Sequence, residues 1–124
     1  MNKSHPQSVF LAYALADRPQ VKKLLGRLKV MGVMRDSDEI IDHAKIIVEG
    51  SGTRREEVRN AINKADKLVV VWSKGGAESA WVNYETAMAD ALGKEIVVLV
   101  PKGQRSELPS LIAENAVLEM DSIH

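Results

Sequence analysis

The chain has 124 residues, the length of a single domain, and we treat 1–124 as one. Its 17 Lys and Arg balance 17 Asp and Glu, so it lacks the strong positive field that binding to nucleic acid or to an anionic membrane requires. It has no cysteine, which excludes a disulfide framework, a thiolate nucleophile and cysteine-based metal sites. Because the three histidines lack metal-ligand spacing, we expect no metal site.

The N-terminus and the apolar runs predict where the protein resides. Residues 1–8 are polar and lack the apolar stretch behind a basic start that marks a signal peptide, and we expect them to be flexible. The longest apolar runs, 68–72 and 96–101, are far shorter than the about 20 residues that span a bilayer. We therefore expect a cytoplasmic protein.

The first third of the chain predicts a strand, a helix and a second strand. The apolar run 9–13 predicts the first strand. Asp17 can cap a helix with Pro19 in its first turn, where a missing N–H does no harm. Apolar residues follow at spacings of three and four until Gly32, which ends the helix, and 33–35 predicts a short second strand.

The middle of the chain begins with the weakest signal. The segment 36–52 starts with acidic residues and ends in glycines, which predicts a long loop that a helical turn or a strand-like piece can interrupt. Thr53 followed by Glu56 is a capping box, so a second helix begins there. The continuous apolar run 68–72 is typical of a strand buried on both faces.

The last third predicts a helix, two strands and a short helix between them. Ser79 can cap a third helix that ends at Gly93, and 96–100 predicts another central strand. A short helix over 108–114 and an edge strand over 116–120 follow. The alternation predicts an α/β fold, a parallel sheet with helices on both faces. In such sheets ligands bind at the carboxyl ends of the strands.

The third helix carries the sharpest signal. A helical wheel puts three apolar side chains on the buried face and three polar ones on the opposite face: Trp81, Met88 and Leu92, against Asn83, Thr86 and Asp90. Glu85 falls only about 40° from the centre of the apolar stripe. A salt bridge or an outward-reaching side chain would explain this carboxylate, and so would a functional cleft. Its place near the carboxyl ends of the strands favours the cleft.

Five segments together resemble a TIR (Toll/interleukin-1 receptor) domain of the bacterial kind, from about Val9 to Met120. They are Val9–Tyr13 with Asp17, which resembles the opening strand; Asp36, which matches the aspartate that opens the long second loop; Leu68–Ser73; Ser79–Glu85, which matches Ser-x-Trp-Val-x-x-Glu; and Lys94–Pro101. The resemblance implies a flavodoxin-like three-layer sandwich with about five parallel strands. The resemblance leaves no counterpart after Met120 for the usual C-terminal helix of the family, so we expect a minimal or truncated TIR fold.

The resemblance also implies an activity, since many bacterial TIR domains cleave NAD+ as a substrate and need no cofactor besides. The catalytic glutamate of the family maps onto Glu85. By position, Tyr13 and the backbone around Ala12 would floor the pocket, and Asp36 would sit at its rim. Ser79 and Trp81 join these as substrate-binding candidates, and Trp81 either packs beside Glu85 or serves as a core aromatic.

The sequence departs from the family at the end of the first strand. Where the family often has serine and serine-histidine, this chain has Ala12, Ala14 and Leu15. Hydroxyl and imidazole partners for a ribose or phosphate are therefore missing there.

A single carboxylate suits the implied reaction. Nicotinamide is a cationic leaving group that departs neutral, so it needs no general acid. One carboxylate facing the ribose can stabilise the oxocarbenium-like transition state. The first hypothesis is therefore an NAD+ glycohydrolase or cyclase in bacterial immune signalling, antiphage defence or an effector role. A non-catalytic adaptor that assembles through TIR–TIR contacts and a nucleoside deoxyribosyltransferase-like enzyme are the alternatives.

The net charge of zero is the sum of a basic and an acidic part of the chain. Residues 1–35 hold seven Lys and Arg against one Asp, whereas residues 36–124 hold ten Lys and Arg against sixteen acidic residues. The simplest interpretation is a solvated basic helix face. Opposite charges on two sides of one molecule also favour head-to-tail association with other copies. We therefore expect other TIR domains as partners, in a homo-oligomer.

Overall fold

The computed structural model describes residues 7–14, 18–35, 37–42, 54–72, 80–104, 106, 108, 112 and 114–120. Five strands form one sheet: β1 (Ser8–Ala12), β2 (Glu39–Asp42), β3 (Lys67–Val71), β4 (Glu95–Pro101) and β5 (Ala116–Met120). The described helices are α1 (Arg18–Val30), α3 (Arg54–Lys64) and α4 (Ala80–Ala91). All pairs are parallel, in the order β2-β1-β3-β4-β5. This confirms the predicted flavodoxin-like α/β fold.

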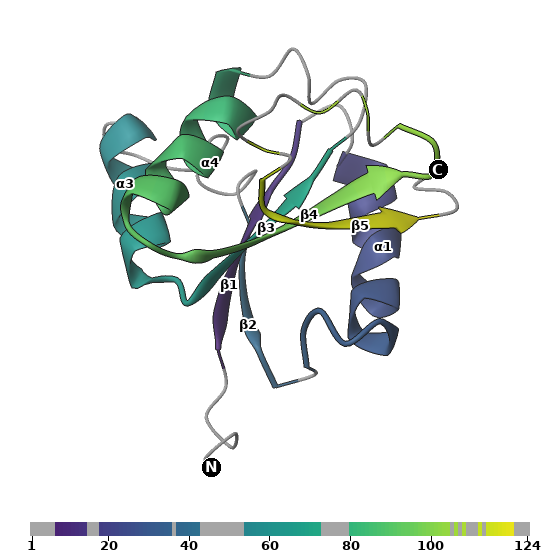
Figure 1. The fold of residues 1–124 in the computed structure, drawn as a ribbon. Coiled ribbons are helices and arrows are strands. Elements are labelled where there is room, and N and C mark those ends of the chain that lie inside the picture. Colours follow the sequence, from purple (N-terminus) through teal and green to yellow (C-terminus); the bar gives the residue numbers. More distant parts are fainter. Residues whose placement is uncertain are drawn as a thin grey trace.

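The sheet has a separate apolar core on each face. Along β1, Phe10 and Ala12 point to the face covered by α3 and α4, whereas Val9, Leu11 and Tyr13 point to the face covered by α1. Figure 1 shows α3 and α4 on one side of the sheet and α1 on the other. Because side chains alternate along a strand, neighbouring residues at the end of β1 serve different faces.

The second strand lies later in the chain than the sequence predicts. Residues 33–35 form no strand; β2 is the segment Glu39–Asp42 inside the expected loop, paired with β1. Val33 instead closes the end of α1, since its N–H donates to the carbonyl of Leu28 at 3.0 Å while Gly32 adopts a φ of +80°. This is the Schellman arrangement, which takes the apolar Val33 into the core beneath the helix.

The other elements lie close to their predicted positions. β1, β3, β4 and β5 each fall within one residue of the expected limits, and Gly93, with a φ of +70°, ends α4 as Gly32 ends α1. The predicted helix over 108–114 and the caps Asp17, Thr53 and Ser79 fall outside the described residues in part or in full. Within the described part of the chain, no helix is long and apolar enough to cross a membrane.

Candidate active site

Helix α4 presents a different face to the sheet from the one that the helical wheel predicts. Its buried residues are Val82, Glu85, Thr86 and Ala89, whereas Leu92 is 40% exposed. Thr86, predicted to face solvent, is 5% exposed and its hydroxyl donates to the carbonyl of Val82 at 2.8 Å. Apart from Glu85, the buried side chains of this face are small, and the bulkier Trp81, Tyr84 and Met88 are half-buried beside them.

Glu85 lies on this buried face together with Val82, Thr86 and Ala89. Its side chain has 0% exposure and is among the largest fully buried ones in the molecule. Its Oε1 accepts no hydrogen bond within the described structure, although the residue does make a polar interaction. A carboxylate in such surroundings is costly to keep for stability alone, which makes Glu85 the leading candidate for a functional group.

The surroundings of Glu85 follow from the topology. In a β–α–β unit with parallel strands, the helix begins at the carboxyl edge of the sheet, so Glu85, in the second turn of α4, lies in the half nearer that edge. Ala12 at the end of β1 and Trp72 directly after β3 belong to the apolar core on the same face. The N–H of Trp72 donates to the carbonyl of Leu99 at 2.7 Å and so continues the sheet past β3.

Tyr13 lies on the other face of the sheet. Its side chain is 1% exposed in the core under α1, and its hydroxyl donates to Oδ1 of Asp42 at 2.6 Å. Sequence reasoning did not single out Asp42. The signal that could have found it is its place at the end of an edge strand beside a tyrosine that ends the neighbouring strand, but that required the correct limits of β2.

Trp81 and Tyr84 form a pair on the flank of α4. Their ring centroids are 5.9 Å apart with an interplanar angle of 84°, an edge-to-face contact, and both rings are half-buried against the core of that face. A cavity of about 280 Å³ lies between α3 and α4, lined by Arg55, Glu56, Arg59 and Tyr84. The carboxylate of Glu85 is not part of its lining.

The predicted site residues that the structure describes therefore divide into three groups. Glu85 and Ala12 share one face of the sheet, Tyr13 lies on the other, and Trp81 stands at the margin of α4. Asp36 and Ser79 lie outside the described residues. Within the described part, no three His, Asp or Glu side chains are grouped as they would be around a metal ion. The chemistry open to Glu85 is that of a single carboxylate in an apolar setting, which can stabilise a developing positive charge.

Comparisons with known proteins agree with this architecture. A solved structure that the chain resembles is a CMP N-glycosidase, BcmB, of Clostridium botulinum, with a TM-score of 0.61, 16% sequence identity, and coverage of 94% of this chain and 92% of that one. At this identity the likeness shows the fold alone. No curated protein matches the chain. The family model for the TIR domain matches residues 9–121, nearly the whole chain, and the chain therefore belongs to the TIR domain family, in its bacterial type.

Proposed function

We propose that the chain cleaves an N-glycosidic bond, with NAD+ as substrate and Glu85 as the catalytic carboxylate. The observation that carries the proposal is the complete burial of the Glu85 side chain on the sheet-facing side of α4, in the half of the helix nearer the carboxyl edge of a parallel sheet. Membership of the TIR family supports the same assignment. No second carboxylate is needed, because the leaving nicotinamide departs as a neutral molecule.

The reaction breaks the bond between C1′ of the ribose and the pyridinium nitrogen. The bonding electron pair goes to that nitrogen, and the positive charge shifts to C1′ and the ring oxygen. The Glu85 carboxylate stabilises this oxocarbenium-like state. Water then adds to C1′ and releases a proton, which gives ADP-ribose, nicotinamide and H+. Attack by a nitrogen of the adenine ring in place of water gives a cyclic product.

Access to the carboxylate requires a rearrangement. Glu85 has 0% exposure, so the groups that cover it must move before a ribose can contact it. Contact between copies is one way to drive this, and the basic residues of 1–35 together with the acidic excess of 36–124 support head-to-tail association. We propose that activity rises with protein concentration. The biological role that we propose is bacterial immune signalling or an effector role, in the cytoplasm.

The proposed substrate-binding residues remain Ala12, Tyr13, Ser79 and Trp81. Asp36 is not proposed further, because it precedes β2 in the chain instead of following it, whereas ligands bind at the carboxyl ends of the strands. Trp81 is half-buried at the margin of α4 and can present a ring edge to a ligand. Tyr13 is engaged with Asp42, so its contribution is to fix the end of β1 on which the backbone of Ala12 depends.

The decisive experiment measures nicotinamide release from NAD+ by the purified protein over a wide concentration range. Wild-type protein should release nicotinamide, and Glu85→Gln should lose at least about 100-fold in rate. The matched control is Asp90→Asn, which neutralises an exposed carboxylate on the same helix and should retain the activity. A silent wild-type protein at every concentration, or an equally active Glu85→Gln, would refute the proposal.

A nucleotide N-glycosidase is the second candidate, favoured by the likeness in fold to a CMP N-glycosidase. The chemistry at C1′ is similar, but the nucleobase of this substrate carries no positive charge. It would leave as an anion, so it must be protonated as the glycosidic bond breaks. Incubation with CMP and with deoxynucleosides, followed by chromatography of the released base, separates this activity from NAD+ cleavage. Base release without nicotinamide release would favour this candidate.

A non-catalytic adaptor is the remaining alternative. It predicts self-association that weakens with salt, together with no turnover of any of these substrates. Sedimentation velocity at rising salt tests this, and a monomer at low salt with no partner binding would refute it.

A further inference from the structure

The amino edge of the sheet holds a second cavity, away from the half that contains Glu85. It has a volume of about 310 Å³ and is lined by Gln7, Gly32, Val33, Met34, Arg35, Asp38 and Lys67. Gln7 directly precedes β1 and Lys67 begins β3, which fixes the cavity at the end of the strands opposite the expected catalytic edge. Nothing in the proposed NAD+ chemistry uses this cavity.

Lys67 is the unusual residue of this cavity. It is 8% exposed, and its ammonium group donates a hydrogen bond to the carbonyl of Val33. An ammonium group has three N–H donors, and a neutral carbonyl does not compensate its charge. Among the described residues no carboxylate oxygen lies within 4.0 Å of it. Burying most of a cation costs free energy unless an anion or ordered water accepts its remaining N–H donors.

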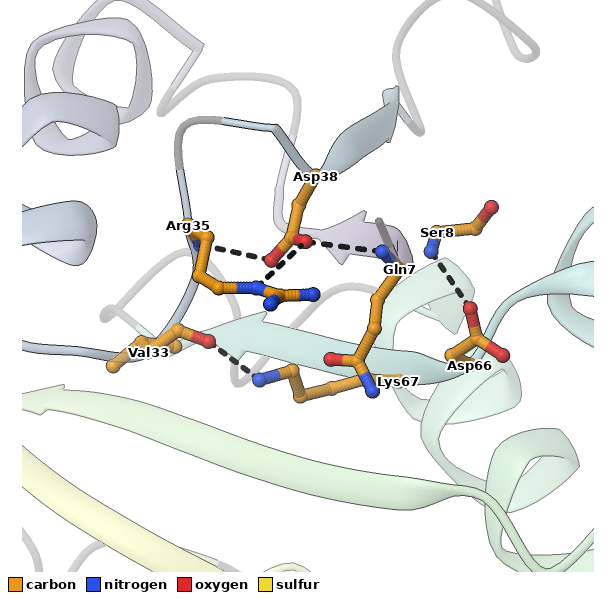
Figure 2. A network of polar contacts seen from close by, with 7 residues as sticks. All are labelled: Gln7, Ser8, Val33, Arg35, Asp38, Asp66 and Lys67. Atoms are coloured by element: carbon orange, nitrogen blue, oxygen red, sulfur yellow. Dashed lines mark hydrogen bonds and ion pairs between the residues drawn. The ribbon is translucent and has the colours of Figure 1, made fainter. Parts of the chain in front are cut away.

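The nearby carboxylate of Asp38 is already engaged by other donors. It accepts the backbone N–H groups of Gln7 at 3.0 Å and Arg35 at 2.8 Å, and the Nε of Arg35 lies 3.6 Å away. Figure 2 shows Asp38 held between Gln7 and Arg35 while the Lys67 side chain reaches toward Val33. Among its described residues the lining thus carries two cations, Arg35 and Lys67, and one anion, Asp38, which accepts its hydrogen bonds from Gln7 and Arg35.

Burial raises the pKa of Asp38, but the two backbone hydrogen bonds and the positive charges of Arg35 and Lys67 outweigh it, so the pKa lies below its ordinary value. Asp38 therefore stays ionised at neutral pH and fixes the position of Arg35. The lining also includes two apolar side chains, Val33 and Met34, which are 6% and 3% exposed.

We propose that the amino-edge cavity is a binding site for a small molecule with a single oxyanion group, a carboxylate or a phosphate. The oxyanion accepts hydrogen bonds from the Lys67 ammonium, and the apolar part of the molecule packs on Val33 and Met34. Since the cavity lies at the other end of the strands from Glu85, this ligand does not compete with a substrate at that residue. The site is independent of the proposed NAD+ chemistry.

The test is a titration followed by amide resonances in ¹H–¹⁵N NMR spectra, with acetate, inorganic phosphate and chloride added separately at matched ionic strength. Acetate or phosphate should cause saturable shifts at Gly32, Val33, Met34 and Lys67, and chloride should not. Whichever of acetate and phosphate binds with the lower dissociation constant identifies the preferred oxyanion, a carboxylate or a phosphate. Shifts that fail to saturate, or that chloride reproduces, would overturn the proposal, because they report ionic strength alone.

Three variants assign the binding to Lys67. Lys67→Met should weaken binding at least tenfold, while Lys67→Arg, which keeps the charge, should largely restore it. Lys64→Met is the matched control, since it removes an exposed lysine outside the cavity and should leave binding unchanged. If Lys67→Met unfolds, Arg35→Gln replaces it, because that side chain is 44% exposed and should weaken binding without unfolding the protein. Unchanged binding in the folded variant would overturn the proposal.

Discussion

The hydroxyl of Tyr13 donates a 2.6 Å hydrogen bond to the carboxylate of Asp42 and joins the ends of β1 and β2. In the register of this pair Leu11 lies opposite Asp42, so Tyr13, two residues further on, projects to the same face as Asp42. β2 has only four residues and stands at the edge of the sheet. β2 has few backbone hydrogen bonds to fix its register, so the side-chain hydrogen bond at its last residue helps to fix it.

Removing this hydroxyl should destabilise the protein. Tyr13→Phe leaves the part-buried Asp42 without one donor, and we expect the free energy of unfolding to fall by about 1–3 kcal/mol. Urea unfolding of the single variants and of the double variant with Asp42→Asn measures the coupling. Tyr84→Phe is the control, since the Tyr84 hydroxyl makes no hydrogen bond within the described structure, and its loss should change stability by less than about 0.5 kcal/mol. Equal effects at both tyrosines would contradict the assignment.

The orientation of α4 can be tested by a pair of opposite substitutions. Ala89 has 0% exposure, so Ala89→Leu must force a larger side chain against the sheet and should cost about 1–3 kcal/mol of unfolding free energy. Leu92 is 40% exposed, so Leu92→Ala should cost less than about 1 kcal/mol. Thermal or urea unfolding gives both values. The helical wheel requires the reverse order, and finding that order would refute the observed orientation.

The sequence predicts most of the fold because the informative patterns here are long. Continuous apolar runs identify β3 and β4, and glycines at the ends of α1 and α4 mark their limits correctly. The prediction fails at β2, where a short apolar pair, Val33 and Met34, resembles a strand but packs beneath a helix end. A strand of four residues with acidic ends gives too little alternation to be recognised.

The candidate site is less predictable than the fold. The helical wheel identifies Glu85 as a carboxylate close to an apolar stripe, but it centres that stripe on Trp81 and Met88. It takes account of hydrophobicity alone, and not of how closely the helix packs on the sheet. The contact between Tyr13 and Asp42 depends on strand order and register, which residue spacing alone does not contain.

Glu85→Gln separates function from stability. The substitution keeps the shape of a fully buried side chain and removes its charge, so we expect nicotinamide release to be lost while the midpoint of thermal unfolding stays the same or rises. Circular dichroism on the same protein samples as the activity assay provides the comparison. A variant that is inactive and also strongly destabilised would indicate a structural role for Glu85.

The lowered pKa of Asp38 predicts a dependence of stability on pH. A carboxyl whose folded pKa lies below its unfolded value, about 3.9, adds stability that is fully present above that pH and is lost as the pH falls through the folded pKa. Wild-type protein should therefore exceed Asp38→Asn in unfolding free energy by about 1–3 kcal/mol at pH 7, with the difference shrinking below about pH 4. Urea unfolding from pH 7 to pH 3 measures it, with Asp90→Asn as the exposed control. A difference that does not change with pH would show that the Asp38 contacts act through shape and not through charge.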